Sequence, residues 1–259
     1  MKRLTRIAAL FVAAASLAAL VSCGKTTDGD NNDKVWIIAT DTVFKPFEFR
    51  DASDNLVGID VDIIAAIAED QGFKYELRSI GWDAAIAACQ SEQADGMIAG
   101  ASITEKRVSE GWIFSDSYYD AAQCMAVSLD SDIKGFEDLS GKTVCVKNGT
   151  QGAEYAESLK DKYGFELTYV EDSPTMYQYV SGGQAVACFE DTPIMASTIH
   201  DQNDQYKLRI VEGSENEGAG YGFAIFKESS RELVDMFNAG LKNIKASGKY
   251  DEILNKYLG

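Results

Sequence analysis

VWIIAT (residues 35–40), VDIIAAIAED (61–70), YELRSI (75–80), WDAAIAAC (82–89) and ADGMIA (94–99) are five patterned segments that follow one another early in the chain. The first, third and fifth are short runs of the kind that form strands. The second and fourth repeat apolar side chains at spacings of three and four residues, which is typical of helices. The order predicts a β-α-β-α-β unit built on a parallel sheet.

A second unit of the same kind follows further along the chain. Its expected strands and helices alternate as 143–147, 151–163, 166–170, 174–180, 185–189 and 192–200. Ser173 before Pro174 predicts the N-cap of the middle helix. A last strand is expected at 221–226, followed by helices at 230–245 and 250–257. Two α/β units in one chain predict two lobes.

Polar and glycine residues follow the expected strands of both units. In open parallel sheets, ligands bind beyond the carboxyl ends of the strands. Those ends carry Asp41, the pair Ala99 and Gly100, the segment 147–150, and the pair Glu190 and Asp191. If the two lobes face each other, these four ends form one cleft.

The N-terminus has the three parts of a secretory signal peptide, predicted here for residues 1–22. Basic residues at the start precede an apolar run over 7–21, which is shorter than the roughly 20 residues of a spanning helix. Residues 20–23, Leu-Val-Ser-Cys, resemble the cleavage site of bacterial lipoproteins. Cys23 is then the lipidated N-terminus, held stably by two or more acyl chains. An ordinary signal peptide with a chance cysteine is the alternative.

Residues 24–33 (GKTTDGDNND) are polar and acidic, so residues 23–33 are expected to form a lipidated, disordered tether before a fold that starts near Lys34. Removal of residues 1–22 takes away three basic residues and no acid, which changes the formal net charge from −17 to about −20. This charge argues against nucleic acid as a partner.

Four further cysteines, Cys89, Cys124, Cys145 and Cys188, lie in apolar stretches and are expected to be buried thiols. Disulfides stay open because no tight spacing identifies a pair. A zinc site lacks the C-x-x-C spacing and has only His200 to add, so no metal and no cofactor are expected.

Seven stretches resemble one known family in both order and spacing over nearly the whole mature chain. They are ATDTVFKPFEF (39–49), VGIDVDI (57–63), AGASITEKR (99–107), FSDSYY (114–119), VKNGTQG (146–152), FEDTP (189–193) and GKYDEILNKYLG (248–259). The family is the polar amino-acid-binding proteins of ATP-driven importers, which are bacterial extracellular solute-binding proteins of family 3. Among its members, the chain most resembles those that bind glutamine.

The resemblance implies a two-lobe periplasmic-binding-protein-like fold of type II, with two crossing hinge segments near 119–123 and 217–221. Lobe 1 would comprise 34–119 and 217–259, and lobe 2 would comprise 120–216. It further implies a monomeric, extracytoplasmic receptor that closes on one free L-amino acid and delivers it to a membrane permease. Such a protein is not an enzyme.

A free amino acid needs a partner for its carboxylate and another for its ammonium. By resemblance, Arg107 binds the carboxylate, since a guanidinium matches it with two parallel hydrogen bonds. Backbone donors of Ser102 and Thr150 assist. The alternative for Arg107 is a solvated helix arginine paired with Glu110.

The resemblance assigns the ammonium to Asp191, helped by the carbonyl of Ala99 or Gly100 and the hydroxyl of Ser102. The alternative role for Asp191 is the N-cap of the following helix. Phe44 and Trp82 would cover the ligand side chain from opposite sides, although each could equally belong to a core.

The identity of the amino acid depends on three charged residues. Asp41 and Lys147 together resemble the pair of glutamine-binding members, in which an acid and a base meet a neutral amide. Glu190 stands where those members often have histidine, and an added carboxylate favours a cation. The Asp41 and Lys147 pair makes glutamine the preferred ligand, and Glu190 keeps arginine or lysine as the rival.

Other classes of protein have less support. Residues 140–143 (SGKT) resemble the end of a phosphate-binding loop, but they precede a strand instead of following one. A few relatives of the fold are small dehydratases of carboxylic acids, for which Glu190 is the one candidate acid or base without another role. A sensory module would be followed by a membrane helix and a signalling domain, and neither appears in the sequence.

Overall fold

The first of two five-stranded sheets defines lobe 1 in the computed structural model, which describes residues 34–258. Its order is β4 (Lys74–Ser79), β1 (Val35–Thr40), β5 (Gly96–Met97), β14 (Ala224–Ile225) and β6 (Ile113–Phe114). β1 pairs in parallel with both β4 and β5, whereas β14 is antiparallel to β5. The helices α1 (Ile59–Gln71), α2 (Trp82–Gln90) and the short α3 (Glu105–Ser109) belong to the same lobe, as does the hairpin of β2 (Phe49–Arg50) and β3 (Leu56–Val57).

The second sheet defines lobe 2. Its order is β10 (Glu166–Val170), β9 (Thr143–Lys147), β11 (Ala187–Asp191), β8 (Gln123–Ser128) and β12 (Leu208–Ile210). β9 is parallel to β10 and β11, while β8 is antiparallel to β11 and β12. The lobe also carries α4 (Gln151–Tyr163), α5 (Ser173–Ser181), α6 (Thr192–Tyr206) and the 3-10 turn Phe136–Leu139.

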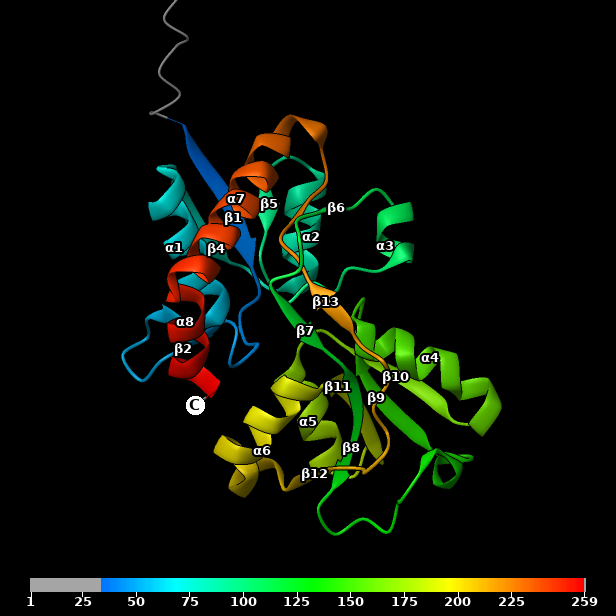
Figure 1. Cartoon of the computed structure of the whole chain (residues 1–259). Helices are drawn as coiled ribbons and strands as arrows, with labels where there is room; N and C mark the ends of the chain where they lie inside the picture. The colour runs from blue at the N-terminus through cyan, green and yellow to red at the C-terminus, as the bar shows by residue number, and fades with distance from the viewer. Residues whose placement is uncertain (1–33, 259) are drawn as a thin grey trace, which may run out of the picture. The chain divides into compact units, whose positions relative to one another are not determined.

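Two strands connect the lobes. β7 (Tyr119–Ala121) and β13 (Ala219–Tyr221) run antiparallel and side by side, with Tyr119 opposite Tyr221 (Figure 1). They lie where the two hinge segments are expected. The chain thus passes from lobe 1 to lobe 2 along one strand and returns along its neighbour.

The C-terminal helices return to lobe 1. After the 3-10 turn Glu228–Ser230, α7 (Arg231–Ser247) and α8 (Lys249–Leu258) bring Phe237, Leu241 and Ile253 into the same core cluster as Ile63 and Ile67 of α1. Gly240 of α7 lies so close to α1 that an added Cβ would stand 2.7 Å from Ile67. The apolar stripe on α7 therefore closes the core of lobe 1.

The structure differs from the sequence expectations in several places. Asp172, not Ser173, caps α5 and accepts a hydrogen bond from the Thr175 N–H. The expected strand at 221–226 is two strands, β13 and β14, with different partners. α6 continues to Tyr206 across a kink at Gln202. β8 and β12 were not expected, and their antiparallel pairing makes the sheet of lobe 2 mixed instead of purely parallel.

The predicted signal peptide, Cys23 and the tether lie outside the described residues. Within residues 34–258, no helix is long and apolar enough to cross a membrane. All four cysteines in this part of the chain are buried and free. Burial raises the pKa of the Cys89, Cys124 and Cys145 thiols to about 12, 12 and 11, so the reactive thiolate is disfavoured.

Candidate functional site

A single cavity between the lobes gathers all of the predicted ligand-binding residues. These side chains nearly fill the cavity and leave a free volume of about 20 Å³, far below the roughly 300 Å³ at which typical ligand sites begin. Its walls are Asp41, Phe44, Trp82, Ala99, Gly100, Ser102, Arg107, Lys147, Thr150, Gln151, Glu190 and Asp191. Sequence reasoning missed only Gln151 of this lining, which is the first residue of α4 and follows directly on the predicted Thr150.

Asp41 and Lys147 meet across the cleft as a buried ion pair. The ammonium of Lys147, at the end of β9, contacts the Asp41 carboxylate beyond β1, and each side chain is at most 4% exposed. Burial by itself would lower the pKa of Lys147, but Asp41, Glu190 and Glu48 together outweigh it, and the pKa lies above its usual range. The Lys147 Nζ also lies 5.4 Å from the centre of the Phe44 ring. Loss of either partner would leave a buried charge without compensation, typically a cost of about 3–5 kcal/mol.

Arg107 is buried in α3 rather than solvated. Its Nη1 donates to the Ser102 carbonyl at 2.9 Å and its Nη2 to the Gly149 carbonyl of lobe 2 at 3.1 Å. The guanidinium carbon lies 5.2 Å from the Trp82 ring centre and 5.1 Å from that of Trp112. Burial lowers the pKa of Arg107 somewhat, but a guanidinium stays charged. Because an arginine has five N–H donors, others remain for a carboxylate.

Further bonds to the segment after β9 join the lobes. The Trp82 indole N–H donates to the Gly149 carbonyl at 3.3 Å, and the Asn148 side chain donates to Asp83 at 3.1 Å. Gly149 has φ +67°, a conformation that favours glycine. At the rim, the more exposed ion pairs Lys106 with Glu154 (2.8 Å) and Lys45 with Asp201 (2.5 Å) also cross between the lobes.

Asp191 ends β11 and is held by both connecting segments. The Gln123 amide donates to its Oδ1 at 2.7 Å, and the Tyr221 hydroxyl donates to its Oδ2. Asp191 stands at the N-cap position of α6, but its side chain accepts no capping bond there, so the alternative role is not realised. Burial and the neighbouring Glu190 raise the pKa of Asp191 to about 7. A cation placed beside this carboxyl would favour its ionised form.

Glu190 is buried in the same wall but is satisfied by neutral donors. The hydroxyls of Ser173 (2.6 Å) and Tyr177 (2.9 Å) donate to Oε2, and the Asp191 N–H donates to Oε1 at 3.0 Å. These bonds hold the carboxylate against α5. Glu190 therefore lines the cavity with much of its bonding capacity already used.

Backbone groups of lobe 1 form the remaining wall. Gly100 has φ +56°, and an added Cβ would stand 2.5 Å from the Phe44 ring, so only glycine fits there. Its N–H is shared between Asp60 Oδ2 at 2.9 Å and the Tyr118 hydroxyl oxygen at 3.2 Å. Across the cleft, the Thr150 side chain caps α4 by accepting from the Ala153 N–H. The helix N-terminus beside Thr150 thus favours negative charge.

Several supporting residues were not identified from the sequence. Gln123, Tyr221 and Trp112 support Asp191 and Arg107, but none of them follows a predicted parallel strand. Tyr221 was treated as the start of a strand, and the other two had no pattern that pointed to a site. Gln123 and Tyr221 lie 68 and 30 residues from Asp191 in sequence, so no local pattern marks their contacts with it.

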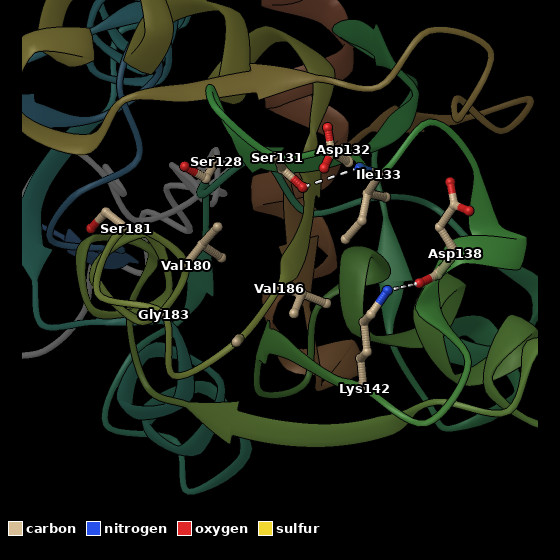
Figure 2. Close-up of a pocket in the computed structure, with 11 residues that line it drawn as sticks. Ser128, Ser131, Asp132, Ile133, Asp138, Lys142, Val180, Ser181, Gly183 and Val186 are labelled. Atoms are coloured by element: carbon tan, nitrogen blue, oxygen red, sulfur yellow. Dashed lines mark hydrogen bonds between the residues drawn. The ribbon is translucent and has the colours of Figure 1, made fainter.

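A second hollow lies within lobe 2 and is larger and more open, with a volume of about 470 Å³. Figure 2 shows its lining, in which the Ile133 N–H donates to Ser131 at 3.2 Å and Lys142 contacts the Asp138 carbonyl. Lys142 directly precedes β9 and Val186 directly precedes β11, so this hollow lies at the amino ends of those strands. Ligands of such sheets bind at the carboxyl ends, where Lys147 and Asp191 lie.

Two α/β lobes joined by paired strands, with a charged cavity between them, define a two-lobe binding protein. The chain belongs to the bacterial extracellular solute-binding proteins, family 3, whose model matches residues 36–259. It is 32% identical over 250 residues to the arginine-binding extracellular protein ArtP of Bacillus subtilis, with 96% of each chain covered.

Two other relatives have different named ligands. The ABC transporter glutamine-binding protein GlnH of Bacillus subtilis is 30% identical over 235 residues, covering 88% of this chain and 82% of that protein. Among solved structures, the arginine-, lysine-, histidine-binding protein ArtJ of Geobacillus stearothermophilus matches with a TM-score of 0.79 at 33% identity. That match covers 87% of this chain and 96% of ArtJ.

Proposed function

We propose that this protein is the extracytoplasmic receptor of an ABC importer and that it captures one free polar amino acid, preferably glutamine, between its lobes. The observation that carries the proposal is the buried pair of Asp41 and Lys147 inside the same cavity as Arg107 and Asp191. Arg107 would bind the ligand carboxylate and Asp191 its ammonium. The Asp41 and Lys147 pair would then face the ligand side chain.

Glutamine suits this pair better than a cation does. Asp41 is the acid that a cationic side chain would need, but Lys147 already contacts it. A guanidinium or ammonium would therefore bring a second cation beside Lys147 in a buried site, which is costly. The amide of glutamine instead offers an oxygen to Lys147 and an N–H to Asp41 without adding charge. Glu190, bonded by Ser173 and Tyr177, is the feature that would favour arginine.

The remaining parts of the proposal concern location and movement. Cys23 would carry the lipid that keeps the receptor beside its permease, and the protein would act as a monomer without catalysis. Lobe 1 (34–119 and 217–259) and lobe 2 (120–216) would close about the paired strands β7 and β13. The relatives named extracellular or periplasmic support this location, and closure would let a permease distinguish loaded from empty receptor.

A thermal-shift screen against the common amino acids tests the ligand class, because a ligand of the folded state raises its stability. The protein without residues 1–31 is suitable, since the rest of the chain forms one compact unit. We expect the largest rise in Tm with glutamine. A larger rise with arginine or lysine would reassign the ligand to the cationic class, and no rise with any amino acid would refute the proposal.

Lys147→Met tests the specificity argument directly. The variant keeps most of the side-chain volume but leaves Asp41 buried without its cation, so a cationic ligand gains a partner. We expect the ratio of glutamine to arginine affinity, measured by calorimetry, to fall about tenfold or more. The matched control is Lys142→Met, an exposed lysine of the same lobe, which should leave the ratio unchanged. An unchanged ratio in Lys147→Met would show that the pair does not select the ligand.

A further inference from the structure

Behind the lobe 1 wall of the cavity lies a pair of acids that the binding site does not use directly. Glu48 and Asp60 are both fully buried, and their carboxyl groups lie close enough to influence each other's pKa. Glu48 follows the turn that carries Phe44, and Asp60 lies in the first turn of α1. Phe44, Phe47, Ile59 and Ile98 belong to the core cluster of this lobe.

The hydrogen bonds of the two acids do not balance if both are ionised. Asp60 Oδ2 accepts from the Gly100 N–H at 2.9 Å and from the Tyr118 hydroxyl at 2.9 Å. Asp60 Oδ1 and both oxygens of Glu48 have no donor among the described residues. Two ionised carboxylates can only accept, so their mutual contact requires a proton on one of them. One proton converts an unsatisfied contact into a hydrogen bond.

The charges that face the pair do not replace that proton. Asp41 at the end of β1 repels Glu48, and Lys147 of lobe 2, the nearby cation, is already in contact with Asp41. Tyr118 is a neutral donor to Asp60, and its own pKa lies well above the usual value because it is buried beside these acids. Burial, with Asp60 as the next cause, raises the pKa of Glu48 well above its usual range, and burial raises that of Asp60 to about 7.

The geometry also indicates which acid is ionised. Asp60 accepts two hydrogen bonds and lies at the N-terminus of a 13-residue helix, where negative charge is favoured. Glu48 has neither support. The proton is therefore on Glu48, which donates a hydrogen bond to the ionised Asp60.

Both acids are connected to walls of the proposed amino-acid site. Asp60 holds the Gly100 N–H, while the Glu48 backbone pairs with Phe44 through N–H to carbonyl bonds of 2.7 and 3.2 Å. Phe44 and Gly100 in turn pack against each other. We propose that Glu48 stays protonated at neutral pH and donates a hydrogen bond to Asp60. This pair is the positioning element that sets Gly100 and Phe44 against the ligand.

Only the positioning of Gly100 and Phe44 rests on the proposed function, so the first test, which concerns the proton on Glu48, uses no ligand. The infrared absorption of a buried carboxylic acid should be present in the wild type at about pH 8, where Asp191 is ionised, and absent in Glu48→Gln. The exposed Glu69→Gln is the matched control and should keep the band. Absence of the band in the wild type would overturn the proposal, whether or not any amino acid binds.

The second test follows stability against pH. Because the folded pair holds a proton that the unfolded chain releases above about pH 4, wild-type stability should fall as pH rises toward and beyond neutrality. Glu48→Gln donates an N–H in place of the proton, so its Tm should exceed that of the wild type by an amount that grows with pH. A difference independent of pH would contradict the retained proton.

Ligand affinity tests the positioning role, with glutamine and arginine as probes. Glu48→Gln should bind the better of them within about twofold of the wild type, because its amide replaces the donor, whereas Glu48→Ala should lose about tenfold or more. The expected pattern is that Glu48→Gln retains ligand affinity and Glu48→Ala does not. Equal loss in both variants, with the infrared band present in the wild type, would retain the proton and refute the positioning role.

Discussion

Each lobe buries a pair of carboxyl groups beside the cleft, and the two pairs differ in how many hydrogen-bond donors they receive. In lobe 1, Glu48 and Asp60 have hydrogen-bond donors to only one of their oxygens. In lobe 2, Glu190 and Asp191 receive hydroxyl, amide and backbone donors on all their oxygens. Arg107 also lowers the pKa of Asp191, though less than burial and Glu190 raise it.

The comparison shows that burial alone does not decide what an acid does. A buried carboxyl with few donors is neutralised by a proton and becomes part of the scaffold. A buried carboxyl with several donors and a nearby cation can carry charge and is available to a ligand ammonium. The lobe 2 pair faces the cavity that contains Arg107, and the lobe 1 pair lies behind its wall.

Removal of Arg107, the cation near the lobe 2 pair, should have the largest effect on ligand affinity. Arg107→Ala deletes the proposed carboxylate partner, removes the Arg107 donor of the Ser102 carbonyl and leaves the Gly149 carbonyl with the Trp82 indole N–H alone. We expect a loss of affinity of about 30-fold to 5,000-fold, from a typical cost of about 2–5 kcal/mol for a truncated buried charge pair. Calorimetric titration with the best amino acid measures it. Arg209→Ala, an arginine bonded to carbonyls far from the cavity, is the control and should bind normally.

Neutralisation of Asp191 should be the next largest effect. Asp191→Asn retains an oxygen for Gln123 and an N–H for the Tyr221 hydroxyl, so the fold should remain intact. Loss of the negative charge should weaken binding about 30-fold to 100-fold, because charged hydrogen bonds are worth about 1.5–3 kcal/mol each. Circular dichroism and Tm check the fold, and titration checks the affinity. Normal affinity in a folded Asp191→Asn would place the ammonium elsewhere.

Acidification should weaken binding more gradually. The pKa of Asp191 is about 7 in the folded protein, raised by burial and by Glu190. An ammonium beside it favours the ionised form, so below pH 7 binding must release a proton and affinity should fall by up to about tenfold per pH unit. Titrations in buffers of different ionisation enthalpy would detect the released proton. The sign for folding is opposite, since the raised pKa makes this group's contribution to stability decline as pH rises toward 7.

The rim ion pair should show the smallest effect. Lys106 and Glu154 join the lobes at 2.8 Å, but the Lys106 side chain is 56% exposed. Exposed pairs contribute about 0–1 kcal/mol and are screened by salt. Lys106→Ala should therefore change affinity by no more than about fivefold at low salt, and less at high salt. A loss as large as that of Arg107→Ala would mean that closure, rather than contact with the ligand, limits binding.

Regular alternation explains why much of the fold could be predicted. The helix 151–163 and the strands 35–40, 143–147 and 166–170 were predicted at the bounds that the structure shows. β8 and β12 were missed because their place in the sheet depends on antiparallel pairing with distant strands and not on a local period. Similarly, Asp172 rather than Ser173 caps α5, since two adjacent polar residues can both precede Pro174 and only the backbone geometry selects one.

The sequence by itself determined the two α/β units, their order and the polar residues at their strand ends, because hydrophobic periodicity and parallel topology are local in origin. The strand ends thereby identified Lys147 and Asp191 as candidates, and the resemblance to the family added Arg107. Only the tertiary structure decided that Lys147 contacts Asp41, that Arg107 is buried between Trp82 and Trp112, and that Glu48 contacts Asp60. These are contacts between side chains distant in sequence, and their burial sets the electrostatics that no local pattern contains.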